Sequence, residues 1–130
     1  MFSGINHVGI AVKKLEEAIQ LYDSLFGTGR PTGVTEWPEL GIREANIPVG
    51  KQVLSFMEPI SPQSEFNRFL ERRGEGLHHV SLEIHGLDQY LVALERKGVP
   101  IIGRGQGWAS VHPRAAKGVW IELLENEVTG

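Results

Sequence analysis

The stretch Gly76-Leu77-His78-His79-Val80-Ser81-Leu82-Glu83-Ile84 alternates polar and apolar side chains from His79 onward. Alternation of this kind is typical of a strand with one buried face. A related stretch occurs earlier, as Ile5-Asn6-His7-Val8-Gly9-Ile10-Ala11-Val12. In both copies a histidine precedes a valine, and a segment with helical periodicity follows. We therefore interpret His7 and His79 as equivalent positions of a duplicated module.

The repeat extends beyond the two histidines. At the offset of 72 that separates them (79 − 7), the apolar positions of the two following segments match, with Leu15 against Leu87 and Ile19 against Leu91. Each copy then has the order strand, helix, three strands. We expect an α+β protein made of two βαβββ modules, at about residues 1–60 and 77–130, within one domain covering residues 1–130. A small sheet cannot bury its face alone, so the modules should pack side by side.

Periodicity and turn residues predict the individual elements. A helix is expected over residues 15–26, ended by Gly27, and a short helix from a Ser64 cap to residue 70 joins the modules. A further helix is expected over residues 87–97, ended by Gly98. Strands are expected at residues 5–12, 34–36, 42–47, 52–57, 79–84, 99–102, 108–111 and 118–124. Pro59 and Pro62 should stop strand pairing, and residues 103–107 should form a flexible glycine-rich turn.

Composition excludes several classes of function. The chain has 130 residues, a formal net charge of −3 and no cysteine. Nucleic-acid binding is not expected, because it requires a basic face, and disulfides and thiolate metal sites are unavailable. No apolar run approaches the roughly 20 residues of a membrane helix, and the amino terminus does not resemble a secretory signal. We expect a soluble cytoplasmic protein without a membrane partner.

The duplication predicts a metal site. If equivalent positions of the two modules face one another, His7 and His79 on the first strands meet Ser55 and Glu122 on the last strands. Two histidines and one carboxylate are a common ligand set for a divalent first-row metal. Symmetry puts Ser55 at a fourth ligand position, where serine is a poor ligand. For each residue alone, an ordinary structural or surface role is the competing interpretation.

Glu44 is the candidate for acid–base chemistry. It lies on a predicted strand next to Ser55, where its carboxylate could face the shared groove and act as a general base. The alternative is an exposed strand carboxylate paired with Arg43 or Lys51. Several arginines and lysines give local positive charge, which would suit an anionic ligand such as a CoA ester or serve solubility alone.

These residues resemble the vicinal oxygen chelate (glyoxalase/bleomycin resistance/dioxygenase) superfamily, and within it most closely the methylmalonyl-CoA epimerases. The most specific pieces are residues 5–12, 15–19, 72–79 and 112–123. The resemblance implies paired βαβββ modules forming a half-barrel cup, a metal in the cup, and a homodimer. It puts the metal-ligand positions on His7, Ser55, His79 and Glu122, and the catalytic base on Glu44. The epimerases carry Gln or Glu where this chain has Ser55.

The implied reaction is proton transfer at the carbon α to a thioester, through a metal-stabilised enolate. Glu44 would take the proton on one face, and Glu122 is the candidate for the second catalytic group. The implied cofactor is a divalent ion of Co, Mn, Zn, Ni, Mg or Fe, and the implied substrate is a small molecule, such as an acyl-CoA. Two alternatives stay open: a glyoxalase-type isomerase or non-haem iron dioxygenase, and a metal-poor protein that sequesters small molecules.

Overall fold

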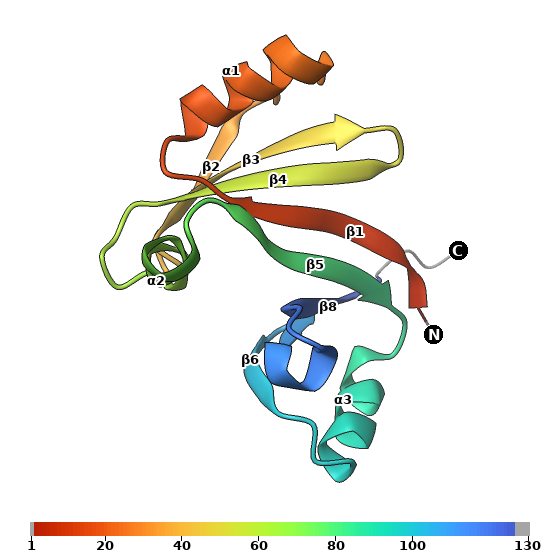
Figure 1. Cartoon of the computed structure of the whole chain (residues 1–130). Coiled ribbons are helices and arrows are strands. Elements are labelled where there is room, and N and C mark those ends of the chain that lie inside the picture. The colour runs from red at the N-terminus through yellow and green to blue at the C-terminus, as the bar shows by residue number, and fades with distance from the viewer. Residues whose placement is uncertain (1, 127–130) are drawn as a thin grey trace. The chain divides into compact units, whose positions relative to one another are not determined.

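The computed structural model describes residues 2–126 and confirms the order strand, helix, three strands, which occurs twice (Figure 1). The first module contains β1 (Phe2–Ala11), α1 (Leu15–Phe26), β2 (Val34–Trp37), β3 (Ile42–Val49) and β4 (Gln52–Pro59). The helix α2 (Glu65–Arg73) follows. The second module contains β5 (Gly76–Ile84), α3 (Leu87–Arg96), β6 (Ile101–Gly105), β7 (Trp108–Val111) and β8 (Ile121–Glu125).

Two compact units divide the chain at positions within β1 and β5. The first unit is Val8–His78, and the second unit combines the residues up to His7 with those from His79 onward. Both long strands therefore contribute to both units. The single-domain organisation over residues 1–130 stays a prediction, and its outermost residues lie outside the described range.

In the first unit the strand order is β2-β3-β4-β1, and α1 lies beside β2, β3 and β4 (Figure 1). β1 runs parallel to β4, with Gly9 opposite Ser55, and the other two pairings are antiparallel. The sequence forms α1 because Leu15 and Ile19, four residues apart, share one buried stripe, which packs against Phe56 on β4. α1 ends at Gly27, which has φ 65° and donates its N–H to Asp23, as expected.

In the second unit β1 is followed by β5-β8-β7-β6. β5 runs parallel to β8 and places Ser81 opposite Glu122, whereas β7 pairs antiparallel with both of its neighbours. The α3 side chains Leu87 and Leu91 pack with Leu123 in a core that the sequence pattern anticipates. Within the described residues, no helix is both long enough and apolar enough to cross a membrane.

Several predicted boundaries are wrong: β1 starts at Phe2, β5 starts at Gly76, and α2 runs on to Arg73. Three further differences lie at strand ends. Pro59 does not interrupt pairing: it lies opposite Ile42, and the next N–H, that of Ile60, donates to Gly41 at 2.7 Å. The segment expected to be a flexible turn is partly strand, since β6 continues to Gly105. A side chain at Gly105 would collide with the Trp108 ring. β8 starts at Ile121 rather than at residue 118, because Lys117 and Gly118, which follow a 3₁₀ turn over residues 113–116, have φ 58° and 90° and cannot belong to a strand.

One glutamate at the end of each module's last strand binds the start of that module's own helix. Glu58 Oε2 accepts the Leu15 N–H at 3.2 Å. Glu125 accepts the N–H groups of Leu87 at 2.9 Å and Gly86 at 3.1 Å, and these bonds lower the pKa of Glu125. A carboxylate at this place satisfies free helix donors and complements the helix dipole. Glu58 and Glu125 thus have the same structural role in the two modules.

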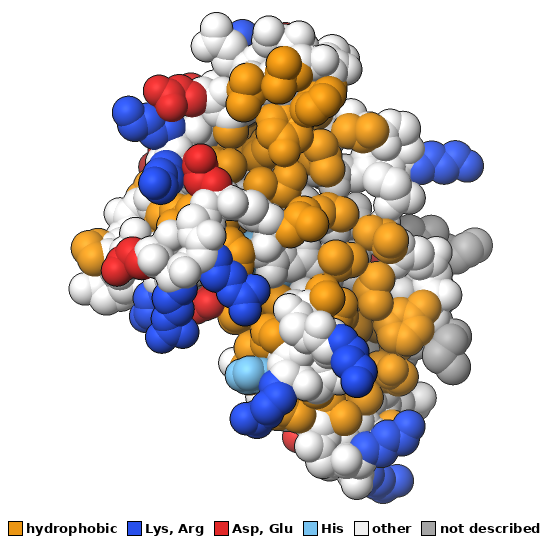
Figure 2. All heavy atoms as spheres, in the orientation of Figure 1, with side chains coloured by type: hydrophobic (Ala, Val, Ile, Leu, Met, Phe, Trp, Pro, Cys, Tyr) orange, Lys and Arg blue, Asp and Glu red, His pale blue; other side chains and the backbone are white. Residues whose placement is uncertain are grey.

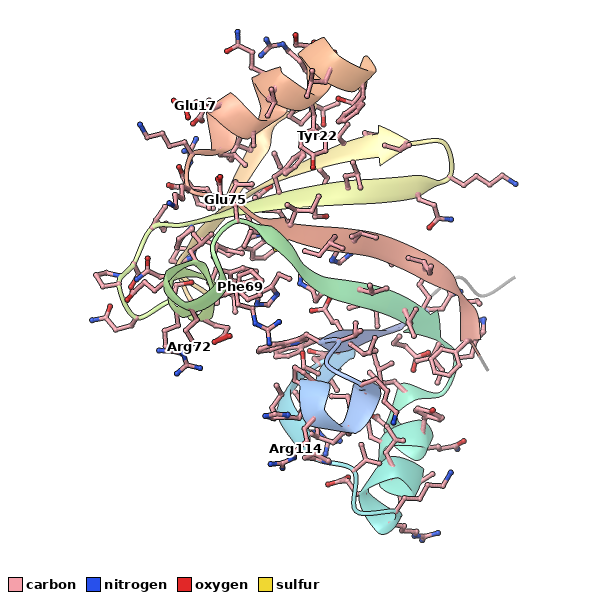
Figure 3. All side chains as sticks on the ribbon, in the orientation of Figure 1. Glu17, Tyr22, Phe69, Arg72, Glu75 and Arg114 are labelled. Atoms are coloured by element: carbon pink, nitrogen blue, oxygen red, sulfur yellow. The ribbon has the colours of Figure 1, made fainter. Side chains whose placement is uncertain are left out.

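His78 is buried beside two aromatic rings of α2. Its ring centroid lies 4.2 Å from that of Phe66 and 4.9 Å from that of Phe69, which is labelled in Figure 3. Burial, and to a smaller extent the positive charge of Arg73, lowers the pKa of His78 to about 4. Because the ordinary pKa is 6.5, the unfolded chain takes up this proton before the folded protein does.

The metal-free protein should therefore lose stability as pH falls from 6.5 to 4 and level off below that window. The His78 contribution to the free energy of unfolding amounts to about 3 kcal/mol over the window. Urea unfolding of the wild type and of His78→Phe, both in excess chelator, measures it as a difference between the two pH profiles. Parallel profiles for the two proteins would contradict this assignment.

Candidate metal centre

His7, His79 and Glu122 come together in the second unit. His7 Nε2 lies 3.0 Å from His79 Nε2 and 3.7 Å from Glu122 Oε1, and the candidate ligand atoms of all three lie within 4.8 Å of one another. His7 comes from β1, His79 from β5 and Glu122 from β8. His79 is buried, and the other two side chains are half-buried. The structure thus brings together three of the four residues that the repeat singles out.

The donor set and its spacing fit a divalent metal. Two nitrogens at right angles, each about 2.1 Å from an ion, are separated by about 3.0 Å, and tetrahedral ligands by about 3.4 Å. The His7–His79 separation of 3.0 Å and the His7–Glu122 separation of 3.7 Å are of this size. Two imidazoles and one carboxylate also suit the first-row metals chemically.

The surroundings of His7 and Glu122 favour the forms that bind a metal. Burial lowers the pKa of His7, so the neutral imidazole with a free lone pair predominates near neutral pH. Ser81 is fully buried on β5; its hydroxyl donates to Glu122 Oε1 and lies 3.0 Å from His7 Nε2. The Asn6 side chain also contacts His7. Sequence reasoning missed Ser81 and Asn6, although Ser81 alternates with His79 on the same strand face.

Ser55 lies in the first unit, on β4, and is almost completely buried at 1% exposure. Its hydroxyl donates to Asn46 Oδ1 at 2.5 Å, and the two residues are opposite one another in the β3–β4 pairing. Asn46 was not singled out from the sequence. The hairpin register, counted back from the turn at residues 50–51, is the signal that could have found it.

Glu44 also lies in the first unit, half-buried on β3. Its Oε1 accepts a hydrogen bond from Trp37 Nε1 at 3.2 Å, a diagonal contact across the β2–β3 pair. The pairing with Arg43 considered above is wrong, because Arg43 binds Glu16 at 2.5 Å and Glu58 at 2.8 Å. These two carboxylates raise the pKa of Arg43.

The first unit contains a cavity of about 320 Å³ beside α1, whose residues Glu17 and Tyr22 are labelled in Figure 3. Its apolar wall includes Ile10 and Leu21, and Glu17 and Glu75 line it as well. Glu17 already pairs with Lys14, and Glu75 accepts the N–H of Lys13. None of the candidate metal ligands lines this cavity, so it is not part of the centre described above.

The sequence profile of the Glyoxalase/Bleomycin resistance protein/Dioxygenase superfamily matches residues 6–118. The chain belongs to this superfamily. It is 31% identical over 128 residues to the uncharacterized protein YqjC of Bacillus subtilis, covering 93% of this chain and 91% of that protein.

Two solved structures are also similar to this chain. The crystal structure of methylmalonyl-CoA epimerase from Mycobacterium tuberculosis is 32% identical, with a TM-score of 0.83, covering 95% of this chain and 88% of that chain. A methylmalonyl-CoA epimerase in complex with methylmalonyl-CoA and NH4+ is 26% identical, with a TM-score of 0.86, covering 98% and 97%. These matches confirm the expected α+β glyoxalase-like fold and identify methylmalonyl-CoA epimerases as relatives of this chain.

Proposed function

We propose that this chain is a metal-dependent epimerase of the methylmalonyl-CoA epimerase type, which moves a proton at the carbon α to a thioester. The observation that carries the proposal is the cluster of His7, His79 and Glu122, whose ligand atoms lie within 4.8 Å of one another. The relatives support the substrate class, because one of them is a complex with methylmalonyl-CoA.

His7, His79 and Glu122 would hold a divalent ion, with Ser55 at the fourth position that the family resemblance implies. When bound, the ion supplies Lewis-acid stabilisation of the negative charge that develops on the substrate oxygens. The chain's own contribution is to keep the His7 imidazole neutral and the Glu122 carboxylate oriented. Burial lowers the pKa of His7, and the Ser81 hydroxyl donates to Glu122.

Glu44 is the proposed base that removes the proton at C2, and Glu122 is the candidate group for its return on the opposite face. A carboxylate is suited to the first role when it is unliganded and oriented. The hydrogen bond from Trp37 Nε1 restrains Glu44 Oε1 and leaves the second carboxylate oxygen for the substrate proton.

Exchange of the C2 hydrogen of methylmalonyl-CoA with deuterium in D₂O, combined with elemental analysis, tests the proposal. The purified protein is expected to contain close to one divalent ion per chain and to catalyse exchange. Chelation should abolish exchange, and the same metal, added back, should restore it. Exchange that survives complete metal removal would overturn the metal-dependent mechanism. Absence of exchange in the metal-loaded protein would overturn the assignment of methylmalonyl-CoA as the substrate.

A metal-poor binding protein is the second candidate, and one observation favours it. The Ser55 hydroxyl, at the implied fourth ligand position, donates to Asn46 Oδ1. For this candidate, elemental analysis should find no bound metal, while methylmalonyl-CoA or another small anion still binds. The glyoxalase-type isomerase or iron dioxygenase would retain the metal without C2 exchange.

We also propose that the protein forms a homodimer, as the family resemblance implies. The helix α1 exposes a set of large apolar side chains in addition to its buried stripe, and Figure 2 shows hydrophobic side chains gathered beside this helix. Leu21, Leu25 and Phe26 are 53%, 63% and 67% exposed. Large apolar side chains exposed on one helix favour association. Sedimentation velocity at micromolar concentration should give the mass of two chains; the mass of one chain would contradict the proposal.

A further inference from the structure

The side chain of Asn6 lies between the candidate metal centre and a carboxylate that does not belong to it. Asn6 Oδ1 is 2.7 Å from His7 Nδ1, and Asn6 Nδ2 is 3.3 Å from Glu83 Oε1. All three side chains are half-buried in the second unit. The two contacts form a continuous series of hydrogen bonds from Glu83 through Asn6 to His7.

The chemistry of the three groups determines which atom donates in each of these hydrogen bonds. An ionised carboxylate only accepts hydrogen bonds, so Glu83 requires the amide NH₂ of Asn6 to face it. The amide oxygen then faces His7. Because that oxygen also only accepts, His7 Nδ1 must carry the ring proton, which leaves the lone pair of a neutral His7 on Nε2.

His7 Nε2, the nitrogen that carries this lone pair, is the ring nitrogen that faces the cluster. His7 Nε2 is 3.0 Å from His79 Nε2 and 3.7 Å from Glu122 Oε1. The Ser81 hydroxyl is also 3.0 Å away, but it donates its proton to Glu122, so it does not compete for this lone pair. The opposite tautomer would direct an N–H at the position of a metal ion. In the side-chain contacts of the second unit described here, only Asn6 holds the Nδ1 side of this ring.

We propose that Asn6, oriented by Glu83, is a positioning residue that sets the tautomer and ring orientation of His7 for metal binding. This inference rests on the proposed metal-dependent function for its purpose, but the tautomer itself is a property of the metal-free protein. Outer partners of metal-binding histidines commonly act in this way, and their loss costs about 10–100-fold in metal affinity.

The first measurement needs no metal. Nitrogen-15 NMR of the metal-free protein at pH 7.5 should show His7 predominantly protonated at Nδ1, and Asn6→Ala should shift it toward a mixture of tautomers. Predominant protonation of His7 at Nε2 in the wild type would overturn the proposal. Since this measurement involves neither metal nor substrate, it decides the positioning role even if the proposed function fails.

The second measurement is the affinity for Zn²⁺ or Co²⁺, determined by competition with a chromophoric chelator. Asn6→Ala should weaken binding about 10–100-fold. Glu83→Gln should weaken it less, because a glutamine side chain no longer dictates which way the Asn6 amide faces. Affinity unchanged in Asn6→Ala would overturn the proposal.

A rescue experiment separates positioning from general damage to the fold. In the double variant Asn6→Asp with Glu83→Gln, the carboxylate introduced at position 6 accepts from both the new amide and His7 Nδ1. This variant should recover most of the affinity lost in Asn6→Ala. The matched control is Asn67→Ala on α2, which breaks a similar hydrogen bond, from Asn67 Nδ2 to Glu71 at 2.9 Å, and should leave affinity unchanged. Failure of the rescue with an intact fold would also overturn the proposal.

Discussion

Replacement of His79 by alanine should reduce the affinity for divalent metal by more than the roughly 10–100-fold that an outer partner costs, and should abolish metal-dependent exchange. The His79 ring is 6% exposed, and its Nε2 lies 3.0 Å from His7 Nε2. Its removal leaves one imidazole and one carboxylate, which are too few protein ligands to hold a first-row ion firmly. Competition titration with a chelator, followed by the exchange assay, measures both losses.

His85→Ala is the matched control for this experiment. His85 directly follows β5, is exposed, and lies outside the cluster of candidate ligands. The control should bind metal and catalyse exchange as the wild type does. Comparable affinities for His79→Ala and the wild type would show that the metal, if one is present, binds elsewhere.

Glu44→Gln is expected to lower the rate of C2 exchange by about 10²–10⁴-fold while the metal affinity stays unchanged. Glutamine keeps the shape of the side chain, and its amide oxygen still accepts from Trp37 Nε1, but it cannot take up the substrate proton. The effect should therefore be on the rate constant of exchange rather than on substrate affinity. Exchange in D₂O and substrate titration measure the two separately.

The control for Glu44 is Glu36→Gln, an exposed carboxylate on the neighbouring strand β2. It should leave exchange unchanged. A fall of less than a few-fold in Glu44→Gln, with normal metal content, would remove Glu44 from the base role and favour another carboxylate. A parallel loss of metal from Glu44→Gln would instead make Glu44 a ligand.

The sequence predicts local structure well where one residue determines the outcome. Gly27 ends α1 because a left-handed residue is needed there, and Ser64 begins α2 because its hydroxyl accepts the Phe66 N–H. Boundaries that depend on strand pairing were missed. β6 reaches Gly105 because Gly105 pairs with Trp108 on β7, and the glycine-rich composition of residues 103–107 does not reveal that pairing.

The same distinction holds for the candidate site. His7, His79 and Glu122 could be predicted because the duplication repeats their surroundings, and a repeat relates positions that are far apart in the chain. Asn6 and Ser81 lie beside predicted ligands, yet only the three-dimensional structure shows their hydrogen bonds. The contact between Trp37 and Glu44 depends on strand register, which the hydrophobic pattern does not determine at that edge.

The division of β1 between the two units affects how the protein is made. His7 is synthesised 72 residues before His79 and 115 residues before Glu122 (79 − 7; 122 − 7), the residues that surround it. The first unit needs only residues 8–78 for its core, so it can begin to fold while the ribosome still holds the remainder. Three ligands become available together only after β8 has emerged. Metal loading should accordingly be post-translational, and a nascent chain shortened before residue 122 should capture metal poorly.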